Sequence, residues 1–254
     1  MKRIKFAIGI ITITSIGLIG CKKQTPTSEG TEVVQQVNQK SMTTIQNPWE
    51  QYELTGELHN LALDAAIRNS QYMNFSLDEK YNFFHNYNES YSIAHNWEVS
   101  SNSLPELEGF YSYLSTPNNV YSGYEEMLTT LSPIEYSYYR SAEALTKIVS
   151  VTKRKLQFDL LTDQVKNESI SDETKAFLIA SLAVIENSKL YFDNNPDVTN
   201  ALIGGGVWRA DISGFKYGWK NPAMGSLQDH WQNGLDVAEL ASYEKRLENE
   251  FRNE

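Results

Sequence analysis

From residue 48 onward, apolar side chains recur every three or four positions, a spacing that places them on one face of an α-helix. Helix start signals accompany this pattern. Ser76 precedes Glu79 by three residues and Ser132 precedes Glu135 in the same way, so the sequence predicts two capping boxes. We therefore expect an all-α, single-domain helical bundle over residues 48–254.

Other segments of the body extend this prediction. Further helix starts are expected at Ser171 and Ser226, which precede acidic residues suited to the positive end of a helix. Residues 176–185 are apolar except for one serine, which predicts a central helix buried on most sides. Residues 149–152 fit a strand or a helix by composition, and we favour a helix.

The first 21 residues have a different pattern, a basic start followed by an apolar run over residues 6–19. This is the layout of an export signal, and the run is shorter than the roughly 20 apolar residues that span a bilayer. It ends in Leu-Ile-Gly-Cys at residues 18–21, which resembles the lipobox of bacterial lipoproteins. The resemblance implies removal of residues 1–20 as a lipoprotein signal peptide and acylation of Cys21, which would anchor the protein in a membrane.

The charge and composition of the rest of the chain limit the classes of partner that we expect. Residues 21–47 are mostly polar and predict a flexible tether with a span of roughly 25 to 30 Å. Loss of the signal would remove three of the 22 basic residues and none of the 32 acidic ones. Such an acidic body repels nucleic acid, so we expect no nucleic-acid partner. Cys21 is the only cysteine, which excludes an intramolecular disulfide.

Two segments of the body carry a resemblance to a known group. The first has the pattern Gly-x-x-His-Asn-x-x-Leu-Asp over residues 56–64, and the second has Asp-x-x-Gly from Asp211 to Gly214. Together with the lipobox they resemble a family of uncharacterised lipoproteins from Bacteroidota-type bacteria. In those relatives the second segment continues into Gly/Ala repeats, whereas bulky residues intervene here at 215–219. The resemblance implies fold and envelope location, and it assigns no activity.

A helical wheel of residues 52–71 gives the first segment two faces. Glu53, Glu57, Asn60 and Asp64 form a narrow polar stripe, for which a solvated face is the simpler interpretation. His59 lies among apolar residues and is therefore predicted to be buried. An unpaired buried polar group costs roughly 1 to 3 kcal/mol, so His59 needs a polar partner.

The same wheel places Asp211 on a face of small residues with Gly214 and Gly218, where glycines permit close backbone approach. A carboxylate on such a face needs a hydrogen-bond donor. Our hypothesis is that the two helices pack across Gly56 and Gly214, and that Asp211 accepts a hydrogen bond from His59, from Asn60 or from both.

The set of polar residues His59, Asn60 and Asp211 has two interpretations. A pair of His59 and Asp211, with the carboxylates of Glu57 and Asp64 as further members of the site, could perform general acid/base catalysis or bind a metal. We favour the alternative, a structural polar clasp of His59, Asn60 and Asp211. No spacing typical of zinc, calcium or phosphate-loop sites is present, so we predict no cofactor and no metal.

Aromatic residues are frequent between Tyr72 and Tyr124, where they could form a platform for a sugar or a peptide. We favour packing for these side chains and for His85 and His95, and we regard the irregular stretch 99–120 as the best position for a binding loop.

Three functions of different classes remain. The leading hypothesis is a noncatalytic binding or structural module of the cell envelope, with an envelope protein, peptide or glycan as partner. The alternative is an envelope hydrolase that uses His59 and Asp211, and the weakest is an immunity or toxin-related surface factor. Lys22 and Lys23 stand where surface-exported lipoproteins of such bacteria carry acidic residues, so we favour the periplasmic face of the outer membrane over the cell surface.

Overall fold

The computed structural model describes residues 47–100, 119–194, 206–221 and 224–252, all within one unit, Ile45–Glu254. The predicted signal peptide, Cys21 and most of the tether lie outside these ranges, as does most of the expected binding loop. In the described parts of the chain the secondary structure is α-helix and one 3₁₀ turn, without any strand. The all-α single-domain bundle is therefore confirmed.

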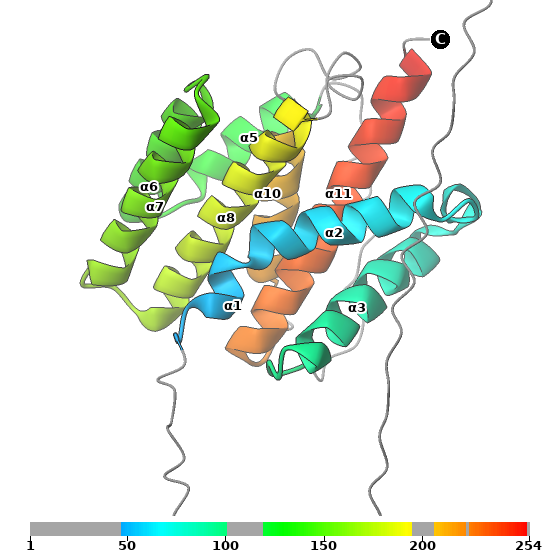
Figure 1. Ribbon diagram of the computed structural model, residues 1–254, viewed down its shortest axis with the longest axis horizontal. Coiled ribbons are helices and arrows are strands. Elements are labelled where there is room, and N and C mark those ends of the chain that lie inside the picture. The colour runs from blue at the N-terminus through cyan, green and yellow to red at the C-terminus, as the bar shows by residue number, and fades with distance from the viewer. Residues whose placement is uncertain (1–46, 101–118, 195–205, 222–223, 253–254) are drawn as a thin grey trace, which may run out of the picture. The chain divides into compact units, whose positions relative to one another are not determined.

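Figure 1 shows the arrangement of the helices. Their bounds are α1 Glu50–Glu53, α2 Thr55–Arg68, the 3₁₀ helix η1 Tyr72–Asn74, α3 Leu77–Ala94, α5 Asn119–Thr129, α6 Pro133–Thr146, α7 Val151–Asn167, α8 Asp172–Asn194, α10 Gly206–Trp219 and α11 Leu227–Arg252.

Both predicted capping boxes are confirmed. The hydroxyl of Ser76 accepts from the Glu79 amide at 3.3 Å, and the Glu79 carboxylate accepts from the Ser76 amide at 2.7 Å. Ser132 and Glu135 exchange the equivalent bonds at 3.4 and 2.8 Å. Each pair satisfies amide groups that the first turn of a helix leaves without a partner, which is why α3 and α6 begin where they do.

The other predicted helix starts are also present. The Ser171 hydroxyl accepts from the Thr174 amide at the start of α8, and the Ser226 hydroxyl accepts from the Asp229 amide at the start of α11. In the segment 149–152 the helix α7 begins at Val151, capped by the Ser150 hydroxyl, so the choice of helix over strand is confirmed for its last two residues.

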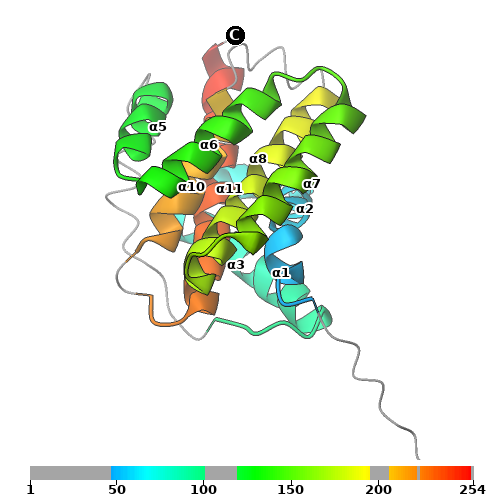
Figure 2. The same ribbon diagram turned by 90° about the vertical axis from the view of Figure 1, so that its left-hand side faces the viewer.

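Helix α8 is the centre of the fold. It contacts α2, α6, α7 and α10, which surround it in Figure 2. Every residue from Ala176 to Ile185 is buried, as the apolar run predicted. Phe177 of α8 packs against Phe215 and Trp219 of α10, and these aromatic rings form the middle of the main core.

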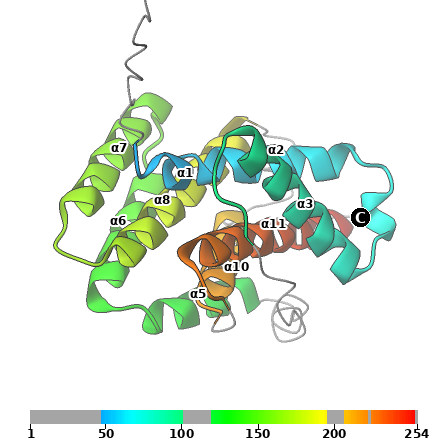
Figure 3. The ribbon, with the colours of Figure 1, turned by 90° about the horizontal axis from the view of Figure 1, so that it is seen from below.

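A second core lies between α2, α3 and α11, which Figure 3 shows side by side. Its central residue is Tyr72, fully buried in η1, whose ring packs edge-on against Tyr243 at 4.4 Å between centroids. Phe84 of α3 is also fully buried there. Tyr72 and Phe84, which belong to the aromatic-rich segment between Tyr72 and Tyr124, therefore have packing roles.

Three glycines mark the closest helix contacts. A Cβ added at Gly56 would lie 2.0 Å from the Ala183 carbonyl oxygen of α8. Additions at Gly214 and Gly218 would lie 2.7 Å and 2.3 Å from the carbonyl oxygens of Val237 and Asn233 of α11. The close approach is as predicted, but the packing of the two helices across Gly56 and Gly214 is wrong, because these glycines face different helices.

Candidate functional site

His59 is fully buried on α2, as predicted. Its Nδ1 atom lies 3.2 Å from the Oδ1 atom of Asn60. Burial lowers the pKa of His59 to about 4, and the contacts with the Asn60 side chain and the Ala238 backbone only partly oppose this effect. The imidazole is therefore neutral at pH 7.

Asp211 is fully buried on α10. Burial raises the pKa of its carboxyl to about 7, while the hydroxyls of Ser188 on α8 and Ser242 on α11 act in the opposite direction. Those hydroxyls face the carboxyl group, although neither of its oxygens has a hydrogen bond of standard geometry. This carboxyl is half protonated near neutral pH.

The expected hydrogen bond from His59 or Asn60 to Asp211 does not form. The Asn60 side-chain amide instead donates to the Asn187 carbonyl oxygen of α8 at 3.0 Å. The structural clasp thus joins α2 to α8 through Asn60, and Asp211 belongs to a separate contact between α8, α10 and α11. The helical wheel gave the buried orientation correctly, but it could not identify the facing helix.

The polar stripe lies on α1 and α2 and is divided between solvent and the neighbouring helices α7 and α8. Glu53 forms an ion pair with Lys166 of α7, and Asp64 accepts a hydrogen bond from the Tyr191 hydroxyl of α8 at 3.0 Å. Glu57 is exposed and has no hydrogen bond or ion pair with any described residue. Asp64 also forms an ion pair with Arg68 at 3.6 Å, and 41% of its side chain is exposed, so the solvated-face interpretation holds for Glu57 and in part for Asp64.

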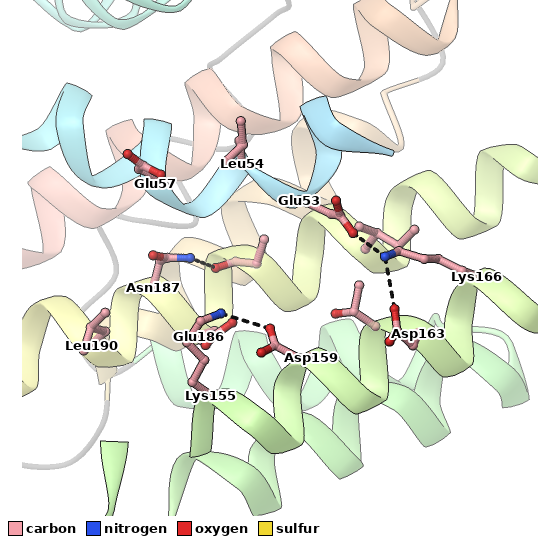
Figure 4. Close-up of a pocket in the computed structure, with 13 residues that line it drawn as sticks. Glu53, Leu54, Glu57, Lys155, Asp159, Asp163, Lys166, Glu186, Asn187 and Leu190 are labelled. Carbon is pink, nitrogen blue, oxygen red and sulfur yellow. Dashed lines mark hydrogen bonds and ion pairs between the residues drawn. The ribbon is translucent and has the colours of Figure 1, made fainter. Parts of the chain in front are cut away.

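Glu57 lies at a groove of about 460 Å³ between α1 and α2 on one side and α7 on the other (Figure 4). We call it the α2–α7 groove. Helix α8 contributes the residues between these two sides. The groove is lined by Glu53, Leu54, Glu57, Lys155, Asp159, Thr162, Asp163, Lys166, Ile179, Ala183, Glu186, Asn187 and Leu190.

Most charges of the α2–α7 groove are paired along its α7 side. Lys155 donates to Asp159 at 3.0 Å, and Lys166 contacts both Glu53 and Asp163, the latter at 3.1 Å. Glu186 of α8 is half-buried, and this burial raises its pKa to about 7, an effect that the positive charge of Lys155 partly opposes. The groove thus contains one carboxyl that titrates near neutral pH.

A second polar cluster, between α3 and α11, was missed at the sequence level. His85 Nδ1 lies 2.7 Å from Asp236 Oδ2, and the Asn88 amide donates to both Asp236 and Glu239 at 2.8 Å. Both carboxylates are fully buried. The available signal was the placement of Asp236 and Glu239 three residues apart in the apolar part of a helix that begins with a capped Ser226.

The described residues contain no set of three or more His, Cys, Asp or Glu side chains that could hold a metal ion. In the same ranges, no helix is both long and apolar enough to cross a membrane. Comparisons with protein-family models, curated proteins and solved structures gave no match.

Proposed function

We propose that this protein is a membrane-anchored helical lipoprotein that acts as a noncatalytic binding module of the bacterial cell envelope. In this proposal Cys21 carries the lipid, residues 22–47 form the tether, and the body presents a binding site. The anchor lies in the outer membrane, on its periplasmic face. The proposal assigns binding to the α2–α7 groove and leaves His59 and Asp211 with structural roles.

The observation that carries this proposal is the groove itself. Its volume of about 460 Å³ falls within the range of small-molecule and peptide sites, roughly 300 to 1,000 Å³. Its lining combines apolar side chains such as Leu54 and Ile179 with charged ones such as Glu57. A mixed lining of this kind gives contact area together with polar groups that orient a ligand.

The alternative of a hydrolase built on His59 and Asp211 has less support. A general acid or base must come within hydrogen-bond reach of the substrate, directly or through one water. Both side chains are fully buried in helix contacts, and neither lines the groove. Their roles in fixing the helices account for their burial without any substrate.

The proposal is tested by site-specific photo-cross-linking in cells. A photoreactive amino acid replaces Thr162, which lines the groove, or Thr152, which is exposed at the start of the same helix and outside the groove. We expect a discrete cross-linked product from position 162 and none from position 152. Failure to cross-link at position 162, or the same products from both positions, would contradict binding at the groove.

A further inference from the structure

The connection between α6 and α7 presents an apolar side chain to solvent. Val149 is 94% exposed, and it lies between Lys147 at the end of α6 and Ser150, whose hydroxyl caps α7. The Arg154 guanidinium is buried and donates to the Ile148 carbonyl oxygen at 2.9 Å, which holds the connection in place. The exposure of Val149 is therefore fixed by the fold.

Two leucines on the outer face of α7 are also exposed. Leu156 and Leu160 are 57% and 49% exposed and lie one helical turn apart. Lys153 precedes them by three and seven residues and therefore shares their face. The opposite face of α7 is buried, and α6 and α7 lie nearest the viewer in Figure 2. We call Lys147, Val149, Lys153, Leu156 and Leu160 the α7 surface.

The segment that carries most of this surface has no exposed acidic residue. From Pro133 to Leu156, every exposed side chain is neutral or basic. Its two acidic residues are Glu135, which is buried, and Glu143, which is partly buried and paired with two arginines. The chain as a whole has 32 acidic residues against 22 basic ones. This segment therefore departs locally from the acidic character of the protein.

The two lysines of the α7 surface have no counter-charge. Lys147 and Lys153 are exposed, and neither ammonium group has a hydrogen bond or an ion pair with any residue that the structure describes. Both acidic residues of α7, Asp159 and Asp163, line the α2–α7 groove, where other lysines pair with them. The α7 surface thus combines uncompensated positive charge with exposed apolar side chains.

One end of α7 lies beside the point where the proposed tether meets the body. The Asn47 side-chain amide donates to Glu53 at 2.7 Å, and Glu53 forms an ion pair with Lys166 near the end of α7. Helix α7 has 17 residues and is therefore about 25 Å long, comparable with the span of roughly 25 to 30 Å expected of the tether. The outer face of α7 can therefore lie along a bilayer that holds the anchor.

We propose that the α7 surface docks on a lipid bilayer that contains anionic phospholipid. Val149, Leu156 and Leu160 enter the headgroup region, and the two lysines contact lipid phosphates. Apolar side chains beside basic ones are typical of helices that lie in a membrane interface. The acidic remainder of the body opposes this contact only weakly, because charges more than about 8 Å away are largely screened at physiological ionic strength.

A second copy of the chain fits this surface less well. A symmetric dimer joins the same surface of both copies, so Lys147 and Lys153 of one copy would face the same lysines of the other. The exposed residues from Pro133 to Leu156 offer no carboxylate to separate them. Lipid phosphates supply the negative charge that this surface lacks. The inference goes beyond binding at the groove, and it uses the proposed anchor only to keep the body near a bilayer.

The test places an environment-sensitive fluorophore on the α7 surface. The variant V149C is labelled at its thiol, and S90C, at an exposed position of α3, is the control. An acylated Cys21 does not react with the label, and labelling of the wild type checks this. Each full-length protein is reconstituted into vesicles of phosphatidylcholine and phosphatidylglycerol in equal parts.

We expect blue-shifted emission from position 149, and we expect quenching there by a lipid that carries a quencher in its acyl chains. Position 90 should show aqueous emission without quenching. Aqueous emission from both positions would overturn the proposal. In vesicles of phosphatidylcholine alone the quenched fraction at position 149 should fall, and an unchanged fraction would contradict the choice of anionic lipid.

The contribution of charge is tested with K147Q/K153Q on the V149C background. The ratio of docked to undocked protein, obtained from the quenched fraction, should fall at least tenfold, because each lysine near an anionic surface adds attraction. The control K175Q/K220Q removes two lysines outside the α7 surface and has the same net charge, so it should dock like V149C alone. Equal losses in the two variants would overturn the assignment of these lysines.

The apolar contribution is tested with L156Q/L160Q on the same background. Both leucines are exposed, so the melting temperature should stay that of the parent while docking falls severalfold. Unchanged docking would contradict contact along α7. A blue shift at position 149 in detergent without vesicles, increasing with protein concentration, would show that a second copy covers the surface and would overturn the lipid assignment.

The anchor and the groove are read separately. Flotation with the vesicles, followed at position 90, reports the anchor. If the protein floats while position 149 stays in water, the lipid contact is wrong and the anchor stands. Cross-linking at position 162 tests the groove and depends on neither result. A lipid adduct at Thr152, close to the α7 surface, adds the mass of one lipid only, so that control stays readable for a protein partner.

Discussion

The imidazole of His85 on α3 contacts the buried carboxylate of Asp236 on α11, with Nδ1 and Oδ2 2.7 Å apart. Asn88, one helical turn further along α3, donates to the other oxygen of the same carboxylate. Two side chains of α3 therefore satisfy one buried charge of α11. This arrangement ties a surface helix to the core by polar contacts as well as by the apolar packing of Phe84.

The pair makes stability depend on pH. The hydrogen bond to Asp236 raises the pKa of His85, so its contribution to the free energy of unfolding is complete below the ordinary histidine pKa and declines as pH rises through the raised value. We expect H85Q to lose about 2 kcal/mol at pH 6 and less at pH 9. Urea unfolding of both proteins from pH 6 to 9 measures this difference, and a constant difference would contradict the ion pair.

Substitution of Gly56 should separate α2 from α8. In G56A the new methyl group would meet the Ala183 carbonyl oxygen at 2.0 Å, and backbone cannot move away as a flexible side chain can. We expect a loss of about 3 kcal/mol or more. In the matched control G234A the nearest atom is 3.1 Å away, so the change should stay within about 1 kcal/mol. Thermal unfolding distinguishes the two, and equal melting temperatures would refute the contact.

Neutral His59 should make the wild type sensitive to acid. Because its pKa is lowered to about 4, the unfolded chain takes up a proton between pH 6.5 and 4 while the folded protein does not, and stability falls with falling pH. The loss amounts to about 3 kcal/mol over this interval. H59Q cannot titrate, so its stability should lack this component. Parallel pH profiles for the two proteins would show that His59 is not buried as described.

Asp211 should have the opposite effect on stability over nearly the same pH interval. Its pKa is raised to about 7, so between pH 4 and 7 the folded protein keeps a proton that the unfolded chain loses, and stability falls as pH rises. We expect D211N to be more stable than the wild type at pH 8, by up to about 4 kcal/mol, and equal to it near pH 3.5. Denaturant unfolding at these two pH values measures the effect. A destabilised D211N at pH 8 would instead indicate that the charged form is required.

The sequence predicted the features of this fold that depend on neighbouring residues. A capping box such as that of Ser76 and Glu79 needs only three residues of separation, and the burial of Ala176–Ile185 follows from an apolar run within one helix. The sequence favoured a helix over a strand at Val151 only slightly. One local signal, the capping hydroxyl of Ser150, marks where this helix begins.

The candidate sites depended on distant pairings and were predicted less well. A wheel shows that His59 and Asp211 point inward, but the partner of Asn60 is Asn187, 127 residues away, and that of His85 is Asp236, 151 residues away. Nothing local selects those partners. Glu57 was a candidate from its own helix, whereas the groove that it lines with residues of α8 required the packing of α2 on α8, which Gly56 permits.

The proposed function depends most on the predicted lipid at Cys21, because the proposed envelope location and the proposed tethered binding role both follow from it. The direct measurement is metabolic labelling with an alkyne-bearing fatty acid, followed by detection on the purified wild type and on C21A. We predict that the wild type carries the label and sediments with membranes, and that C21A does neither. An unlabelled wild-type protein would contradict the proposed anchor and the location argued from it.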